Sequence, residues 1–156
     1  MRYIEVTDNE QLSEVREIFA EYTASLGINL DFQGVEAELA ALPGKYAPPE
    51  GAIFLAIDQE TAGCVALRKL EEGVGEIKRL YVRPHFKGRG LGRQLMSLII
   101  RKAPELGYTK LRLDTLPSMK EAVSLYTSLG FNRIAPYCYN PIEGAMYMEL
   151  TLPSHM

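Results

Sequence analysis

The feature that most constrains the fold of this chain is a glycine-rich loop between an expected strand and an expected helix. The stretch HFKGRGLGRQLM, residues 85–96, has glycine at Gly88, Gly90 and Gly92. It follows the expected strand GEIKRLYVRP and opens GLGRQLMSLIIRKA, whose apolar residues recur at helical spacing. Such a loop presents free backbone amides and the positive end of the helix dipole, and glycine lets a ligand approach the backbone closely. The segment therefore predicts an anion-binding strand–loop–helix unit.

The charge around this loop supports an anion site. Walker A and dinucleotide-binding loops require the spacings GxxxxGKS/T and GxGxxG, and neither fits, since Leu95 stands where the last glycine of the second pattern would be. The alternative is a solvated loop at a helix start. Basic side chains packed this densely repel one another, however, unless a bound anion neutralises them. In a chain of net charge -3, residues 78–93 contain no acidic residue and these basic ones: Lys78, Arg79, Arg83, Lys87, Arg89 and Arg93.

Composition narrows the class of protein. A net charge of -3 disfavours a general nucleic-acid binder. Cys64 and Cys138 are far apart and outside any CxxC or Cys/His cluster, so neither a disulfide framework nor a metal site is expected. No apolar run approaches the roughly 18 residues of a membrane span. We expect a single cytoplasmic domain over residues 1–156 that binds neither nucleic acid nor a membrane.

Hydrophobic periodicity divides the chain in the order β-α-α-β-β-β-α-β-α-β-β. This order joins a strand meander to two strand-to-helix units, which is an α+β pattern. Thr7 or Asp8 is expected to cap the first helix, and Gly27 to end it. The expected strands are RYIEV, AIFLAID, TAGCVALRKL, GEIKRLYVRP, TKLRLDTL, FNRIAPYCYN and AMYMELTL, with helices in TDNEQLSEVREIFAEYTASLG, FQGVEAELAAL, GLGRQLMSLIIRKA and PSMKEAVSLYTSLGF.

The stretch VRPHFKGRGLGRQLM resembles the cofactor-binding segment of the GNAT superfamily of acetyl-CoA-dependent N-acetyltransferases. The family pattern is V-x-P, then Q/R-x-x-G-x-G/A and an apolar helix; Val82, Pro84, Gly90 and Gly92 match it. Lys87 stands where the family usually has Gln or Arg, and Lys lacks the planar fork of Arg. GEIKRLYV resembles the preceding strand, and SMKEAVSLYTSLGF the later helix ending in Y-x-x-x-G-F. Together with the order of elements, the resemblance covers nearly the whole chain.

The resemblance implies a GNAT fold, with a mixed, mostly antiparallel sheet of about seven strands flanked by four helices. The parallel central strands GEIKRLYV and TKLRLDT would splay apart, and acetyl-CoA would lie in the gap as cosubstrate, with no metal required. Backbone groups of the first strand would hold the pantetheine arm, and the loop would hold the pyrophosphate. The expected cofactor-binding residues are Leu80, Tyr81, Val82, Lys87, Gly88, Arg89, Gly90, Leu91, Gly92 and Arg93.

Acetyl transfer also requires an uncharged amine and a proton for the leaving thiolate. An amine with a pKa of about 10 is mostly protonated at neutral pH, so a base must take its proton. Family members often carry a glutamate where Glu76 stands, and this candidate base requires burial or a bridging water. Tyr126, in the Y-x-x-x-G-F pattern, is the candidate acid. The alternative for Glu76 is a polar residue at a strand start without a catalytic role, and the alternative for Tyr126 is an aromatic core residue.

The helix that carries this tyrosine departs from the family at one position. Where members commonly have Asn, this chain has Met119, so an amide contact to the cofactor is expected to be missing. Ser118 is expected to cap the helix, with Glu121 completing the capping box and Gly130 at C′. The alternative is a cap that also reaches toward CoA.

The expected acceptor is the primary amine of a small or amino-acid-like molecule, bordered by Arg79, Tyr137 and Tyr139. Neither cysteine has a His nearby in sequence, so direct attack in a ternary complex is expected instead of an acyl-enzyme. The segment YTASLGINLDFQGVEAELAALPGKYAPPEG is expected to cover the acceptor. A protein or peptide acceptor, a non-catalytic CoA sensor and a homodimer remain open alternatives.

Overall fold

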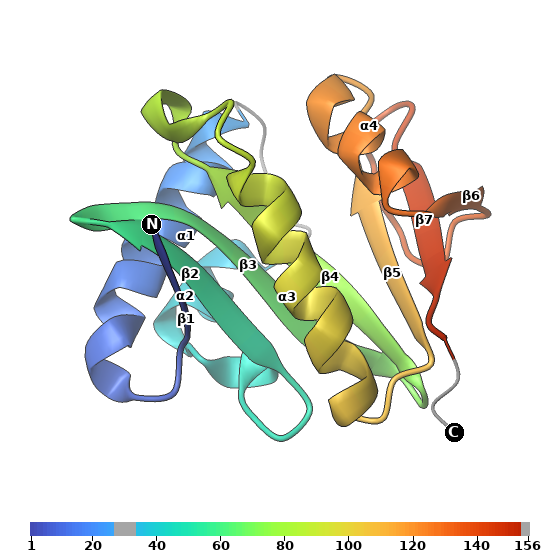
Figure 1. Ribbon diagram of the computed structural model, residues 1–156. Coiled ribbons are helices and arrows are strands. Elements are labelled where there is room, and N and C mark those ends of the chain that lie inside the picture. Colours follow the sequence, from blue (N-terminus) through green and yellow to red (C-terminus); the bar gives the residue numbers. More distant parts are fainter. Residues whose placement is uncertain (27–33, 154–156) are drawn as a thin grey trace.

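A seven-stranded sheet forms the centre of the computed structural model, which describes residues 1–26 and 34–153 (Figure 1). The strand order is β1-β2-β3-β4-β5-β7-β6, and all neighbours are antiparallel except β4 and β5. The strands are β1 (Arg2–Glu5), β2 (Ala52–Asp58), β3 (Glu60–Glu71), β4 (Val74–Val82), β5 (Lys110–Thr115), β6 (Asn132–Ile134) and β7 (Met146–Thr151). The helices are α1 (Leu12–Ser25), α2 (Val35–Ala40), α3 (Leu91–Glu105) and α4 (Lys120–Ser128). This order and the α+β class confirm the sequence prediction.

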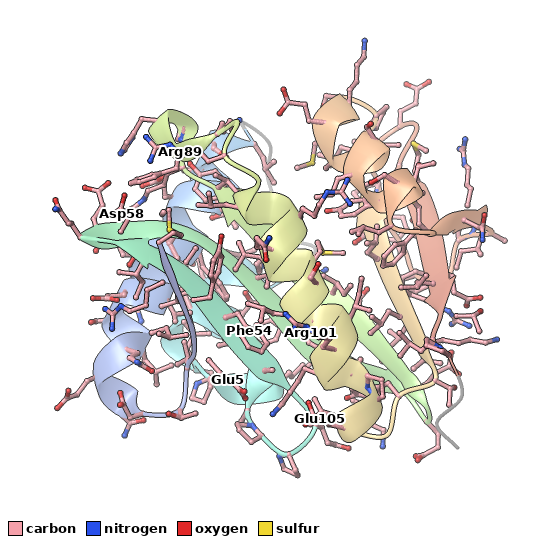
Figure 2. All side chains as sticks on the ribbon, in the orientation of Figure 1. Glu5, Phe54, Asp58, Arg89, Arg101 and Glu105 are labelled. Atoms are coloured by element: carbon pink, nitrogen blue, oxygen red, sulfur yellow. The ribbon has the colours of Figure 1, made fainter. Side chains whose placement is uncertain are left out.

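Helices cover both faces of the sheet, α3 and α4 on one and α1 and α2 on the other (Figure 1). Along β2, Phe54 belongs to the core under α3 (Figure 2), whereas Ile53 and Leu55 belong to the core under α1. A strand covered on both faces needs apolar residues at successive positions. This explains why AIFLAID and TAGCVALRKL are nearly continuous apolar runs.

The two parallel strands separate soon after they meet, as the resemblance implied. Residues 74–76 of β4 pair with residues 110–112 of β5, and beyond them the strands diverge (Figure 1). A bulge accompanies the divergence, because the register between β3 and β4 shifts and Arg79 has a φ of 62°, in the left-handed region. The guanidinium of Arg79 binds the Glu38 carboxylate of α2 through Nε at 3.0 Å and Nη2 at 3.1 Å. The ion pair therefore ties the bulge to the helix layer.

The expected capping box of α4 is wrong, although the end of this helix is as predicted. Met119 is the N-cap residue and no side chain caps the helix, because a turn that pairs the Met119 amide with the Leu116 carbonyl starts the helix one residue later. At the other end Gly130 has a φ of 101°. The Gly130 amide donates to the Thr127 carbonyl, and the Phe131 amide donates to the Tyr126 carbonyl. This is a Schellman motif.

Two further expectations concern the ends of elements. Asp8 accepts from the Gln11 amide at 3.2 Å and caps the turn that leads into α1, as predicted, while Gly27 lies outside the described residues. The strand expected over residues 131–140 is only β6. Pro136 has no amide to donate, and beyond it Tyr137 turns toward Glu76 instead of continuing the strand. None of the helices formed by the described residues combines the length and apolar character needed to cross a membrane.

Candidate active site

A cavity of about 680 Å³ lies between the end of β4, the glycine loop and the start of α4. All of the expected cofactor-binding residues line it except Arg89. The side chain of Arg89 lies instead over the Phe86 ring, 5.3 Å from its centroid, and its Nη1 is 3.9 Å from Oδ2 of Asp58. Arg89 and Asp58 are labelled in Figure 2. The remaining wall comes from Phe86, from the end of α1 and from α4 with the residues before it: Tyr22, Ser25, Leu26, Ser118, Met119, Lys120, Glu121, Ala122 and Leu125.

The glycine loop leaves a run of backbone amides available to a ligand. Gly88 and Gly90 have φ of 83° and 79°, and a Cβ at either position would meet nothing within 4 Å. Among the described residues, no acceptor pairs with the amides of residues 88–93, and the first bond of the helix is Gln94 to Gly90 at 3.1 Å. The Lys87 amide is not free, because it donates to the Pro84 carbonyl at 3.3 Å. A diphosphate fits this cradle, because the positive helix end and open backbone face the cavity together.

A smaller cavity of about 50 Å³ occupies the splay between β4 and β5. Ile77, Lys78, Arg79 and Leu80 line it from β4, and residues 113–116 line it from the end of β5 and the residue after it. The two cavities adjoin, since four residues line both: Tyr22, Leu26, Leu80 and Met119. A ligand held at the glycine loop can therefore reach the splay along the edge of β4 that has no strand partner there.

Tyr126 lines the smaller cavity and is 6% exposed. Its hydroxyl makes no hydrogen bond to another described residue, and its ring packs against Phe131 at 5.9 Å. Burial raises the pKa of this phenol above its ordinary value, so the hydroxyl keeps its proton throughout the neutral range. The Tyr126 hydroxyl is thus a protonated donor beside the splay, with no partner among the described residues, which is what the predicted acid requires.

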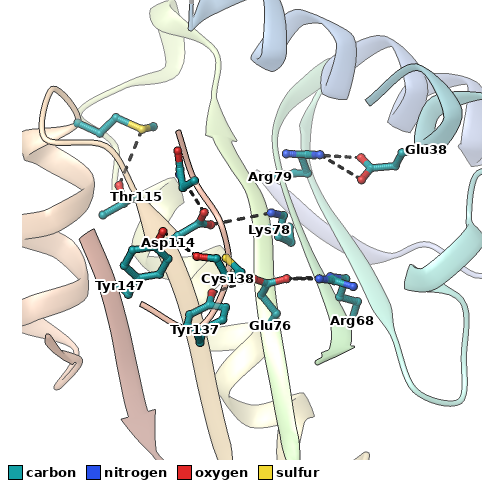
Figure 3. A network of polar contacts seen from close by, with 12 residues as sticks. Glu38, Arg68, Glu76, Lys78, Arg79, Asp114, Thr115, Tyr137, Cys138 and Tyr147 are labelled. Carbon is teal, nitrogen blue, oxygen red and sulfur yellow. Dashed lines mark hydrogen bonds and ion pairs between the residues drawn. The ribbon is translucent and has the colours of Figure 1, made fainter. Parts of the chain in front are cut away.

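Glu76 is 1% exposed, so the burial that its expected role required is present. Arg68 donates to Oε1 from Nε at 2.8 Å and from Nη2 at 2.7 Å, and the Tyr137 hydroxyl donates to Oε2 at 2.7 Å (Figure 3). Burial, followed by the Glu76 charge, raises the pKa of Tyr137 and keeps this hydroxyl protonated. Glu76 lines neither cavity, so a substrate proton can reach it only through a bridging group.

The residues expected at the acceptor border separate into different places. Arg79 lines the smaller cavity, while Tyr137 stands at Glu76 and Tyr139 is 77% exposed and lines neither cavity. Of the cysteines, Cys64 is fully buried and donates to the Arg79 carbonyl at 3.1 Å; burial raises the pKa of its thiol. A buried thiol with a raised pKa is a poor nucleophile. The segment expected to cover the acceptor lies partly outside the described residues.

Three polar residues line the smaller cavity although sequence reasoning did not place them there: Lys78, Asp114 and Asn140. Lys78 and Asp114 face each other across the splay (Figure 3), with 3.9 Å between Nζ and Oδ1. Asn140 donates to Oδ2 of Asp114 at 3.2 Å. TKLRLDTL was expected to be a strand, but sequence reasoning assigned no role to Asp114 and did not identify its partner. Ser118, expected to be a cap, belongs to the wall of the larger cavity.

Comparison with known proteins agrees with this geometry. A sequence model of the Acetyltransferase (GNAT) family matches residues 12–131. An uncharacterised N-acetyltransferase of Schizosaccharomyces pombe is 40% identical over 146 residues, covering 92% of this chain and 90% of that protein. The uncharacterised N-acetyltransferase YjgM of Escherichia coli is 30% identical over 142 residues, covering 86% and 82%.

Solved structures share the fold. A GNAT acetyltransferase of Staphylococcus aureus has a TM-score of 0.78 at 18% identity, covering 97% of this chain and all of that one. The acetyltransferase yncA of Salmonella typhimurium, solved with its cofactor acetyl-CoA, has a TM-score of 0.69 at 19% identity, covering all of this chain and 97% of that one. With the splayed sheet, the glycine loop and the matched sequence model, the chain belongs to the acetyltransferase (GNAT) family.

Proposed function

We propose that this protein transfers the acetyl group of acetyl-CoA to the amine of a small-molecule acceptor, by direct attack in a ternary complex. The observation that carries the proposal is the run of unpaired amides over residues 88–93, which opens onto a cavity continuous with the splay. Acetyl-CoA supplies the activated acetyl thioester. The family assignment and the bound cofactor of the yncA structure support it.

The proton movements of this transfer assign roles to two residues. The acceptor ammonium first loses a proton; its nitrogen then bonds to the acetyl carbon, the carbon–sulfur bond breaks, a second proton leaves nitrogen and one is delivered to sulfur. Glu76 takes the first proton through a bridging water, because neither Glu76 nor Tyr137, whose hydroxyl donates to Oε2, lines either cavity. Tyr126 donates the proton to the thiolate sulfur. Its hydroxyl is protonated, has no hydrogen-bond partner among the described residues, and belongs to a side chain that lines the smaller cavity.

Glu76→Gln is expected to lower turnover about tenfold at neutral pH, with the loss shrinking as pH rises. A free amine with a pKa of about 10 deprotonates by itself in alkaline solution, so a base is needed less there. The measurement is the pH profile of kcat for the variant and the parent protein.

Glu149→Gln is the matched control for this variant. The Glu149 carboxylate also binds an arginine, Nε of Arg112 at 2.8 Å, and lines neither cavity. We expect its pH profile to match that of the parent. A folded Glu76→Gln protein with the parental rate at every pH would remove Glu76 from the mechanism.

Lys87→Ala is expected to weaken CoA binding only two- to fivefold. Its side chain lines the larger cavity as an exposed charge, and an exposed ion pair contributes at most about 1 kcal/mol. The amides of residues 88–93 supply most of the grip. Calorimetric titration with CoA tests this, with exposed Lys45→Ala as control; a loss of about 100-fold would show that the lysine dominates.

A thiol-release assay tests the proposed function as a whole. Acetyl-CoA is offered with single small amines, amino acids, polyamines and peptides, and the acetylated product is identified by mass spectrometry. We expect release with at least one small amine. Release with peptides alone would favour a protein acceptor, and tight CoA binding without release would favour a sensor; either result contradicts the proposal.

A further inference from the structure

Lys78 and Asp114 occupy equivalent positions at the mouth of the splay. The last paired residues of the parallel strands are Glu76 and Arg112, and Lys78 and Asp114 each stand two residues further on. Two residues along a strand return the side chain to the same face. The two side chains therefore lie on one face of the sheet and point toward each other (Figure 3).

These opposite charges are mostly removed from water, yet they satisfy each other poorly. Their side chains are 13% and 10% exposed, and the gap of 3.9 Å between Nζ and Oδ1 is too long for a hydrogen bond. Among the described residues, Lys78 has no hydrogen-bond acceptor, and Oδ1 of Asp114 has no donor. Charges in such surroundings are costly unless hydrogen bonds complete them.

The neighbouring cations are already engaged. Arg79 is held by Glu38, and Arg68 by Glu76. Among the described residues that line this cavity, Lys78 is thus the cation whose ammonium has no hydrogen-bond acceptor, and Asp114 is the anion that faces it. A ligand with one positive and one negative charge would pair with both Asp114 and Lys78 and leave the site neutral. A simple amine would pair with Asp114 alone.

We infer that the acceptor is a free α-amino acid, with its ammonium on Asp114 and its carboxylate on Lys78. In an α-amino acid one carbon separates the two groups, which suits a pair of side chains that face each other at close range. The inference rests on the proposed function and specifies its acceptor class. Tyr126 lines the same cavity, so an amine held by Asp114 lies beside the group assigned to the sulfur.

Matched pairs of acceptors test the carboxylate contact. Free alanine, leucine, methionine and phenylalanine are compared with their α-carboxamides, by kcat/KM in the thiol-release assay. A charge-assisted hydrogen bond that is lost costs about tenfold or more in affinity. We expect the best free acid to exceed its amide by at least that factor, and the ratio to fall toward one in Lys78→Met.

Three variants separate a specificity role from a structural one. Lys102→Met makes the same change at a lysine of α3 that pairs with Glu5 of β1 and lines neither cavity. This variant should keep the parental ratio. Lys78→Arg should restore part of the preference. Asp114→Asn, which keeps the size of the side chain, should raise KM for acids and amides alike. Binding of the best acid in the presence of CoA, measured by calorimetry, should weaken at least tenfold in Lys78→Met.

The outcomes distinguish this inference from the proposed function. Amides acetylated as fast as acids, or an unchanged ratio in folded Lys78→Met, would overturn the inference. Release with polyamines or other simple amines but with no amino acid would overturn it while leaving the proposed function standing. Absence of release with any amine would defeat the proposed function itself.

Discussion

Replacing Gly90 by Asp is expected to raise the Kd for CoA by about 100-fold or more. The open space beside the Gly90 Cα would receive a carboxylate, which would take the place of the diphosphate at the start of α3. Each charge-assisted hydrogen bond lost costs about 1.5–3 kcal/mol, so losing two accounts for the factor. The φ of 79° adds a strain of about 1–2 kcal/mol for a residue with a Cβ, which the fold should tolerate.

Two control variants isolate the charge from the strain. Gly90→Asn has nearly the same shape without the charge, and it should bind CoA more tightly than Gly90→Asp. Gly107→Asp introduces the same residue at a φ of 93°, also into open space, but beyond the other end of α3. It should bind CoA as the parent does in calorimetric titration. Equal affinities for Gly90→Asp and the parent would place the anion seat elsewhere.

Tyr126→Phe is expected to lower kcat by about 100-fold while leaving CoA affinity and stability nearly unchanged. Loss of a positioned acid typically costs 10²–10⁴-fold in rate. The hydroxyl has no partner among the described residues, so its removal should change the free energy of unfolding by only about 0.5 kcal/mol. Steady-state kinetics, CoA titration and denaturant unfolding measure the three quantities.

Tyr108→Phe provides the opposite pattern. Tyr108 is equally buried, lines neither cavity, and donates its hydroxyl to the Glu50 carbonyl. Its loss should reduce stability by about 1 kcal/mol and leave kcat unchanged. Unchanged kcat in Tyr126→Phe would instead return Tyr126 to the core.

The sequence predicted the order of helices and strands well because that order depends on local periodicity. The apolar spacing that begins at Leu91 and the glycine at Gly130 act over a few residues, and both features appear where they were expected. Ser118 shows the limit of such reasoning. A capping box requires an N-cap residue at one position, and the turn closed by Leu116 and Met119 moved the helix start by one residue.

The candidate site was predictable where a ligand is held by backbone and unpredictable where side chains from separate strands meet. The glycine pattern by itself predicts a loop with free backbone amides. Among the described residues, the amides of residues 88–93 have no acceptor. Glu76 was identified by its position, but its partners were not: Arg68 precedes it by a hairpin, and Tyr137 follows it by 61 residues.

The sequence by itself determined an α+β chain with an anion-binding strand–loop–helix unit, because spacing, turn residues and helix termini are local properties. Only the tertiary structure decided that pairing of β4 and β5 stops after residue 76, and that Lys78 then faces Asp114 across the opening. The physical reason is that register between distant strands is set by the bulge at Arg79 and by packing on both faces.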